Sequence, residues 1–261
     1  MIVFLHLPKT AGHSLKALAL ARFGEERVAH VNDGPTMESF VRDHRPGRWD
    51  FVQGHMPWGL AERVGERGTY FTVLREPVDR FVSDYYYIHN APGHPAHRGM
   101  RERGITLRDF ARVPSPVHPF TQNAQVRRLC RYDLRPRSDG RPWWAAHETI
   151  GDAALDDAKE TLARRIDAFG LYERMADTMA EFAALIGTEL HEMPRENVTP
   201  LRRAVNELDD ETVAAIREAN RFDVALYEFA VALADARAAR RSTTRPAFLA
   251  GVVASRPGSA G

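Results

Sequence analysis

The sequence contains very little lysine and almost no cysteine. Lys9, Lys16 and Lys159 are its only lysines, so arginine supplies nearly all of the positive charge. The single cysteine, Cys130, cannot form a disulfide within the chain, which favours a reducing compartment. No charged and then apolar leader precedes the first apolar run, which excludes a typical secretory signal. We therefore expect a cytoplasmic protein.

Long apolar runs are also missing. The best late stretch, residues 247–254, is well short of the roughly 20 residues that a membrane-spanning helix needs, so we expect no membrane partner. The formal net charge of only +1 argues against a chain built as a whole to bind nucleic acid. With 261 residues, of which 44% are hydrophobic, the chain can bury one α/β domain. We assign residues 1–241 to this single domain and residues 242–261 to a flexible tail.

Strand and helix patterns alternate along most of the chain. This alternation predicts a mostly parallel sheet flanked by helices, which binds ligands at the carboxyl ends of its strands. Residues 91–144 predict long loops and short helices, and from Asp152 onward the pattern is helical, with two helices in residues 209–240 that break near Asn220. The expected strands are Ile2–His6, Val28–Val31, Phe51–Gln53, Tyr70–Leu74 and Ala168–Tyr172, and the other expected helices are Ser14–Phe23, Met37–Asp43, Ala153–Arg165 and Met175–Ile186.

The first strand runs into a turn whose residues suit a phosphate. A helical pattern opens at Ser14, directly after this turn, and a helix N-terminus presents free backbone N–H groups to an anion. Lys9 adds a positive charge, and the hydroxyls of Thr10 and Ser14 add donors without demanding a metal. The candidate nucleotide-binding residues of the turn are Lys9, Thr10, Ala11, Gly12, His13 and Ser14.

A later strand, Tyr70–Leu74, runs into a second turn of this kind. Arg75 follows the strand, Pro77 suits the first turn of a helix, and Ser83 lies two turns along that helix. The planar guanidinium of Arg75 and the hydroxyl of Ser83 could grip one phosphate from two sides. The alternative is an arginine that caps the sheet and a serine on a helix surface. Together the two turns predict a site for a doubly phosphorylated nucleotide.

The two turns carry a family resemblance. Lys9 precedes the single glycine, unlike in the usual G-x-x-x-x-G-K-[ST] loop, and the order P-K-T-x-x-x-S resembles the 5′-phosphosulfate loop of sulfotransferases that use 3′-phosphoadenosine 5′-phosphosulfate (PAPS). Arg75-Glu76-Pro77 with Arg80 and Ser83 resembles their 3′-phosphate motif, although Arg80 could instead pair with Glu76 to support the helix. The resemblance implies a P-loop-like three-layer fold, PAPS as donor, 3′-phosphoadenosine 5′-phosphate (PAP) as product, and no metal.

Further residues resemble the branch of that family that includes heparan and uronyl 2-O-sulfotransferases. Gly54-His55 resembles the Gly-His of this branch, which implies that His55 is the catalytic base, with His13 as its rival. Lys9 would be catalytic as well, because a cation stabilises charge on the departing 5′-phosphate oxygen. Asn197 and Thr199 lie about where family members close over the 3′-phosphate end of the donor, but ordinary turn residues explain them equally well.

An arginine-rich stretch follows the second turn. Between Arg98 and Arg141 the chain has eleven arginines and four acidic residues. The stretch could hold an anionic acceptor or be a solvated basic loop, and both interpretations stay open. We expect a sulfotransferase that transfers a sulfuryl group from PAPS to a hydroxyl of a carbohydrate or other glycan-like acceptor. The alternatives are a non-catalytic module that binds a nucleotide or a sulfated glycan, and a divergent P-loop kinase, which would need Mg²⁺ ligands.

Overall fold

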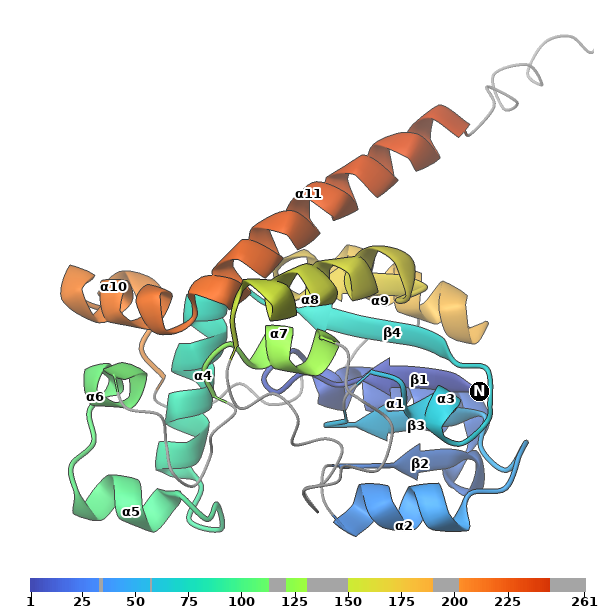
Figure 1. The fold of residues 1–261 in the computed structure, drawn as a ribbon, viewed down its shortest axis with the longest axis horizontal. Helices are drawn as coiled ribbons and strands as arrows, with labels where there is room; N and C mark the ends of the chain where they lie inside the picture. Colours follow the sequence, from blue (N-terminus) through green and yellow to red (C-terminus); the bar gives the residue numbers. More distant parts are fainter. Residues whose placement is uncertain (33–34, 57, 113–120, 131–149, 190–201, 245–261) are drawn as a thin grey trace, which may run out of the picture.

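A five-stranded parallel sheet forms the centre of the computed structural model, which describes the chain except residues 33–34, 57, 113–120, 131–149, 190–201 and 245–261 (Figure 1). The strand order is β2-β3-β1-β4-β5. The sheet consists of β1 (Ile2–Leu5), β2 (Val28–His30), β3 (Phe51–Gly54), β4 (Thr69–Leu74) and β5 (Ala168–Leu171). Each expected strand is present, and all described pairings are parallel, which confirms the predicted α/β sheet.

The helices agree with the sequence patterns, although several begin or end one to four residues away from the expected position. The break between the last two helices falls at Asn220, as predicted, but the last helix continues to Thr244, into the predicted tail, and the first begins at Gly12 rather than Ser14. The helices are α1 (Gly12–Phe23), α2 (Pro35–Asp43), α3 (Leu60–Arg63), α4 (Pro77–Asn90), α5 (His97–Glu102), α6 (Leu107–Arg112), α7 (Ala124–Leu129), α8 (Asp152–Arg164), α9 (Met175–Ile186), α10 (Asp210–Ala219) and α11 (Arg221–Thr244). Short 3₁₀ turns span Glu25–Arg27, Tyr172–Arg174 and Val205–Glu207.

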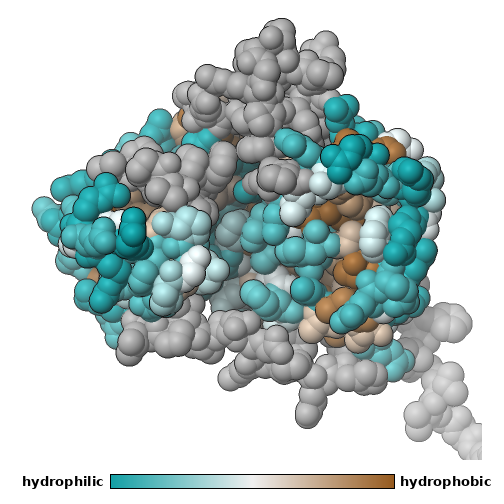
Figure 2. All heavy atoms as spheres, turned by 90° about the horizontal axis from the view of Figure 1, so that it is seen from below, coloured by the Kyte–Doolittle hydropathy of each residue, from teal (hydrophilic) through white to brown (hydrophobic). Residues whose placement is uncertain are grey.

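The helices form layers on both faces of the sheet, as a parallel sheet requires. α1 and α9 pack on one face, and α7, α8 and α11 pack on the other. Much of the face seen in Figure 2 is hydrophilic, with apolar residues gathered in one area at its right side. None of the described helices combines the length and the apolar character that a membrane crossing requires.

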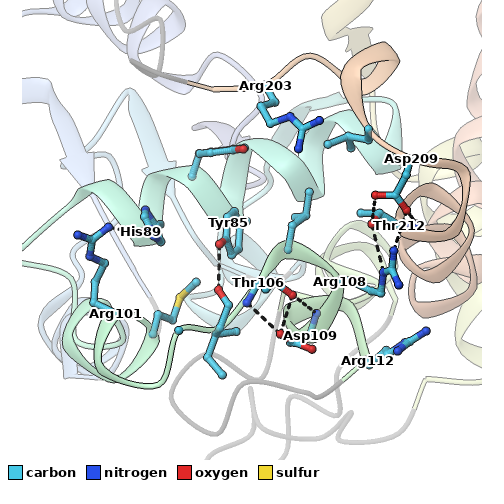
Figure 3. A pocket seen from close by; sticks show the side chains of 16 residues that line it. Tyr85, His89, Arg101, Thr106, Arg108, Asp109, Arg112, Arg203, Asp209 and Thr212 are labelled. Carbon is cyan, nitrogen blue, oxygen red and sulfur yellow. Dashed lines mark hydrogen bonds and ion pairs between the residues drawn. The ribbon is translucent and has the colours of Figure 1, made fainter.

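Four helices lie beside the sheet rather than on it. α4, α5, α6 and α10, which we call the helical lobe, share an apolar cluster of their own that includes Phe81, Ile88, Phe110 and Ile216. A cavity of about 750 Å³ lies within this lobe (Figure 3). The short helices α5 and α6 agree with the prediction for residues 91–144 in the part of that segment that the structure describes.

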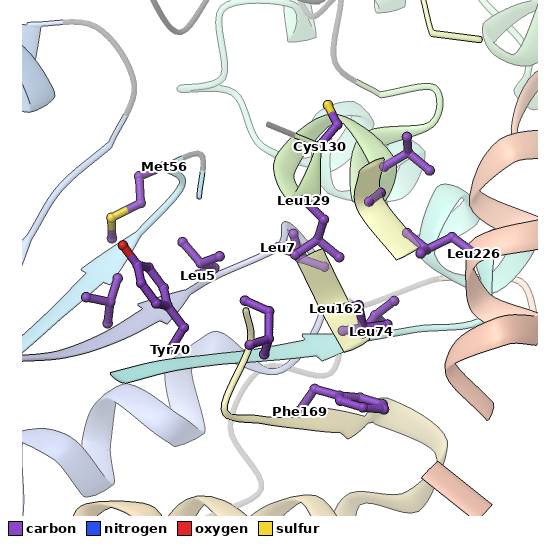
Figure 4. Close-up of a cluster of buried hydrophobic side chains, with 14 of the residues drawn as sticks. Leu5, Leu7, Met56, Tyr70, Leu74, Leu129, Cys130, Leu162, Phe169 and Leu226 are labelled. Carbon is purple, nitrogen blue, oxygen red and sulfur yellow. The ribbon is translucent and has the colours of Figure 1, made fainter. Parts of the chain in front are cut away.

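Successive residues of β1 enter different cores, because side chains alternate along a strand. Val3 and Leu5 pack toward α7 and α8 with Leu162 (Figure 4), whereas Phe4 packs against Phe182 of α9. Each of these side chains is fully buried, and burial of such a side chain contributes roughly 1.5–3 kcal/mol. The two cores hold β1 rigidly between β3 and β4, so that the turns following these three strands meet at one edge of the sheet.

Candidate active site

The turn after β1 has a strained backbone. Lys9 and Ala11 adopt left-handed conformations with φ of 71° and 64°. Such conformations cost a residue other than glycine about 1–3 kcal/mol and cluster at functional sites. Thr10 is buried and stabilises the turn, because its hydroxyl donates to the carbonyl of Leu7 over 2.7 Å. The Thr10 proton is therefore bonded within the turn, and this residue positions its neighbours.

Helix α1 begins directly after the turn. A Cβ on Gly12 would lie 2.0 Å from Nε2 of His6, so any larger residue here would displace the His6 ring. Within the described part of the chain, no side chain caps α1 and no acidic residue lies in its first turn. The exposed His13 and the half-buried Ser14 flank this helix end, where the Ser14 N–H donates to the Ala11 carbonyl over 3.2 Å. The positive end of the helix dipole thus remains available to an anion.

The Lys9 ammonium lies over an aromatic ring. Its Nζ is 4.2 Å from the ring centroid of Tyr87, on α4. Burial lowers the pKa of Lys9, and the charges of Arg75 and Arg202 lower this pKa further, while the Asp84 carboxylate raises it. A cation in such a place is only partly solvated, and an anion that approaches it gains a stronger attraction than in water.

Arg75 connects the two phosphate turns. It is 4% exposed, and its Nη1 donates to the carbonyl of Lys9 over 2.7 Å, across 66 residues of sequence. Its Nε and Nη2 contact Oδ2 of Asp79 at 2.7 and 2.5 Å, and its guanidinium lies 3.9 Å from the ring centroid of Tyr172. Pro77 occupies the first turn of α4, as predicted. The two turns therefore form one site.

A third cation joins this site from a distant segment. Arg202 pairs with Asp79, and burial lowers the pKa of Arg202 to about 10, with the charge of Arg75 as the second cause. Ser83 lies two turns into α4 and is 3% exposed. Arg75 and Arg202 thus pair with one carboxylate, Asp79, while Asp84 raises the pKa of Lys9. Three partly desolvated cations make a strong candidate anion site.

The backbone of β3 places His55 at the same edge of the sheet. Gly54 has a φ of 146°, and a Cβ there would lie 1.9 Å from the carbonyl oxygen of Val31, so only glycine fits. The His55 N–H donates to Oδ1 of Asn32 over 3.0 Å, and the His55 carbonyl accepts from Arg128 over 3.2 Å. Backbone contacts therefore hold this residue on both sides.

The ring of His55 is oriented by the carbonyl of His6. The His55 Nδ1 lies 2.8 Å from this oxygen, so Nδ1 carries the proton and Nε2 is left as the acceptor. The two imidazole rings lie 4.6 Å apart. Burial lowers the pKa of His55 to about 4, so the ring is neutral at pH 7. Asp84 raises the pKa of both His55 and Lys9, which places the three groups in one electrostatic environment.

Two further histidines stand near this ring. Burial is the main cause that lowers the pKa of both His6 and His30, and neighbouring histidines, among them His13, add to the effect. Among the described residues, no group of three or more histidine, cysteine or acidic side chains is arranged to hold a metal. The sequence analysis gave His13 as the rival base. The structure shows His13 exposed in the first turn of α1, where its charge contributes to lowering the pKa of His6.

Several predicted residues lie elsewhere or have structural contacts. Asn197 and Thr199 fall outside the described residues. Arg80 does not pair with the Glu76 carboxylate; it is fully buried, its Nη2 donates to the carbonyl of Thr121, and its Nε lies 3.9 Å from Asp223. The predicted Arg80–Glu76 pair is therefore wrong. The Glu76 carboxylate instead caps α4, since it accepts a hydrogen bond from the N–H of residue 79.

Three residues of the site escaped the sequence patterns. Arg202 lies 123 residues from its partner Asp79, and no local spacing relates them. Asp84 follows Ser83 directly and could have been noticed as an acid inside a phosphate motif. Tyr87 follows Tyr85 and Tyr86 on α4 and is 47% exposed. Its spacing of four from Ser83 on a helix places both on one face, which was the available signal.

This α/β sheet, with partly desolvated cations and a glycine-backed histidine at one edge, defines a candidate site for phosphate chemistry. Comparison with known proteins agrees: the model of the sulfotransferase family matches residues 1–230, and the chain belongs to this family. The chain is 24% identical to heparan-sulfate 6-O-sulfotransferase 1 of Cricetulus griseus over 271 residues, which cover 88% of this chain and 66% of that protein. The Homo sapiens protein of that name is also 24% identical, with 88% and 64% covered.

The chain spans slightly less than two thirds of the length of these curated relatives. Heparan-sulfate 6-O-sulfotransferase 2 of Danio rerio is 24% identical, with 88% of this chain and 57% of that protein covered. Among solved structures, mouse sulfotransferase SULT7A1 complexed with PAP matches with 14% identity and a TM-score of 0.40, over 73% of this chain and 59% of that chain.

Proposed function

We propose that this protein is a sulfotransferase that transfers a sulfuryl group from PAPS to a hydroxyl of a glycan-like acceptor. The observation that carries the proposal is the bond from Arg75 Nη1 to the carbonyl of Lys9, which joins two phosphate turns in one site. Membership of the sulfotransferase family supports the same chemistry. A kinase of similar fold would use the site differently, because it needs Mg²⁺ ligands beside the phosphates.

The donor has two phosphate ends, and the chain offers two sets of groups. The N-terminus of α1 with Lys9, supported by Thr10, Ala11, Gly12, His13 and Ser14, would hold the 5′-phosphosulfate. Arg75 and Ser83, with Arg202, would hold the 3′-phosphate, and Asn197 and Thr199 stay candidates for the same end. Arg75 and Arg202 are already fixed by Asp79, so the phosphate meets donors whose positions are set in advance.

Transfer requires a base and a stabilised leaving group. Nε2 of His55 would accept the proton of the acceptor hydroxyl as the bond from that oxygen to sulfur forms and the bond from sulfur to the 5′-phosphate oxygen breaks. Lys9 and the α1 amides would stabilise the negative charge that this oxygen gains. A bound anionic donor raises the pKa of a nearby imidazole, which moves His55 from about 4 toward the range of an effective base.

The curated relatives are named as heparan-sulfate 6-O-sulfotransferases, which supports a glycan acceptor. We propose a hydroxylated acceptor of this kind without a metal in the reaction. The cytoplasmic location expected from the sequence stays a prediction, and fractionation of the source cells would test it.

A nucleotide-binding measurement and a transfer assay together test the proposed function. Calorimetry should show that PAP binds in the presence of EDTA. AMP should bind distinctly more weakly, because it lacks the 3′-phosphate that Arg75 and Ser83 would bind. Labelled PAPS should then transfer its label to a glycan acceptor. Equal affinity for PAP and AMP would contradict the assignment of the 3′-phosphate site. Binding of PAP without transfer to any hydroxylated acceptor in a broad screen would favour the non-catalytic module instead.

A further inference from the structure

The proposed reaction leaves the cavity of the helical lobe unused. Its volume of about 750 Å³ is in the range of small-ligand sites. Tyr85, Tyr86 and His89 line it from α4, and arginines line it from three other segments (Figure 3). The ring of Tyr85 is fixed, because its hydroxyl donates to the carbonyl of Ile105 over 2.9 Å. The cavity is therefore lined on one side by an aromatic ring whose position a hydrogen bond fixes.

The acidic groups of the cavity are already bonded. Asp109 accepts from the N–H and the hydroxyl of Thr106 at 3.0 and 2.6 Å, at the start of α6. Asp209 caps α10 through Thr212 and also pairs with Arg108 at 2.9 Å. These bonds lower the pKa of both carboxyl groups, that of Asp209 to about 2. Neither carboxylate forms a salt bridge with Arg101, Arg112 or Arg203, although the charge of Arg112 also lowers the pKa of Asp109.

Three guanidinium groups of the cavity lack a carboxylate partner among the described residues. Arg101 Nη1 lies 3.2 Å from Nε2 of His89, and Arg203 donates to the backbone carbonyl of Glu207. Arg112, at the end of α6, is exposed and has no hydrogen bond or ion pair to a described residue. Arg101 and Arg112 belong to the arginine-rich stretch, whereas Arg203 comes from a segment almost a hundred residues later, and the fold brings the three to one cavity.

We propose that this cavity is an anion subsite that binds a sulfate group of the acceptor chain, away from the hydroxyl that reacts. The inference rests on the proposed function, because it assigns the acceptor's remote end to the cavity. It commits to one of the two interpretations of the arginine stretch, that of a site for an anionic acceptor. Much of the face seen in Figure 2 is hydrophilic.

The cavity and the transfer site share two structural elements. α4 presents Ser83 and Tyr87 to the transfer site and Tyr85, Tyr86 and His89 to the cavity. Arg202 contacts Asp79 in the transfer site, and the next residue, Arg203, lines the cavity. An extended oligosaccharide can therefore reach both places along one helix, which a monosaccharide cannot.

The test compares two arginine variants that differ in their relation to the cavity. The double variant R101Q/R112Q removes two charges from the cavity. The control R98Q removes one charge from α5, the helix that also carries Arg101. Arg98 is largely exposed, pairs with Glu102 and does not line the cavity. The probes are a sulfated hexasaccharide, its desulfated counterpart and inorganic sulfate. Calorimetry measures direct binding, and PAP affinity and melting temperature report on the fold.

In R101Q/R112Q, the Kd of the sulfated hexasaccharide should rise about tenfold, as expected for two partly exposed charge contacts, with PAP affinity unchanged. Its KM as acceptor should rise similarly at constant kcat, and the desulfated counterpart should show no change. R98Q should stay within about twofold of the unaltered protein. Equal effects of R98Q and R101Q/R112Q, or no effect of either, would overturn the subsite.

Two further outcomes separate the subsite from the proposed function. Inorganic sulfate that binds as tightly as the hexasaccharide would also overturn the subsite, since the cavity would then be a simple anion site. If the hexasaccharide binds through Arg101 and Arg112 but no acceptor is sulfated, the proposed function fails and the binding cavity stands.

Discussion

The two sides of the candidate site hold their functional groups in different ways. At the ends of β1 and β3, backbone carbonyls, N–H groups and close-packed glycines hold Lys9 and His55, so Lys9 Nζ and His55 Nε2 lie outside any ion pair among the described residues. At the end of β4, charged side chains hold one another, as Arg75 and Arg202 do through Asp79.

This difference separates chemistry from binding. A group that must gain or lose charge during a reaction works best when its reactive atom is not already bonded to an opposite charge. Groups that only bind a constant charge gain from being fixed in advance by one another. We therefore expect substitutions on the β1–β3 side to reduce the rate, and substitutions on the β4 side to reduce the affinity for the nucleotide.

The largest effect is expected for His55→Ala. Loss of a general base typically reduces the rate about 10²–10⁴-fold, and the acceptor atom Nε2 is lost with the ring. The affinity for PAP and the rise in melting temperature on PAP binding should be kept, because no contact to the nucleotide is assigned to His55. Single-turnover transfer and calorimetry measure the two quantities.

His13→Ala is the matched control for that variant. His13 is exposed, so its removal should leave the fold intact and the rate within a few-fold. If His13→Ala abolished transfer while His55→Ala retained it, the base would belong to the phosphate turn, and the acceptor would not lie beside the end of β3.

Lys9→Ala should reduce kcat by about 10²–10³-fold, because the Lys9 ammonium stabilises a negative charge that develops mainly in the transition state. The affinity for PAP should fall much less, since Arg75, Arg202 and the α1 amides remain. Steady-state kinetics at saturating donor, with calorimetry of PAP, measure both effects. If donor affinity collapsed while turnover at saturating donor stayed normal, Lys9 would serve nucleotide binding and not the transfer step.

Arg75→Gln should weaken PAP binding about 10- to 100-fold and leave AMP within about twofold, as expected for the loss of a charge-assisted contact worth about 1.5–3 kcal/mol. The ratio of the two affinities is measured by calorimetry and does not depend on a modest loss of stability. Arg27→Gln is the control, because Arg27 forms a comparable pair with Asp50 at the opposite end of the sheet, at 2.7 Å. If the ratio of PAP affinity to AMP affinity were unchanged in Arg75→Gln, the 3′-phosphate would not bind at this end of β4.

The smallest effect is expected from pH. The pKa of His55 falls from its usual 6.5 to about 4 on folding, so the unfolded chain binds more protons between these values. The stability is complete above pH 6.5 and is lost as the pH falls toward 4, and His6, whose pKa is also lowered, adds to the loss. Melting temperatures between pH 7.5 and 4.5 should decline less steeply in His55→Asn than in the unaltered protein. If melting temperature declined equally with pH in both proteins, the His55 ring would not be buried in its neutral form.

Features that depend on local sequence could be predicted. The five strands and the break at Asn220 arise from apolar runs and helix periodicity, which a window of a dozen residues contains. The end of the last helix was predicted too early, because Ser242, Thr243 and Thr244 resemble a linker in composition. A helix that is already formed extends at little cost through such residues, and α11 therefore runs through them.

The long-range contacts of the site could not be predicted. The turn residues Lys9 and Arg75 were found from their motifs, but the bond between them depends on the neighbouring positions of β1 and β4. The role of Arg202 depends on a contact across 123 residues. Tyr87 could not be identified either, because a run of three tyrosines does not show which of their rings contacts a lysine from another turn.

The position of Lys9 over the ring of Tyr87 has a kinetic consequence. Lys9 covers one side of the ring of Tyr87, which is 47% exposed, with 4.2 Å between Nζ and the ring centroid. As Lys9 turns toward the donor's phosphate, that side of the ring becomes free beside the site of the acceptor. We therefore expect ordered addition, in which the donor binds first, and initial-rate patterns with PAP as product inhibitor would reveal random addition if this expectation is wrong. In this order the donor itself would complete the surface on which the second substrate rests.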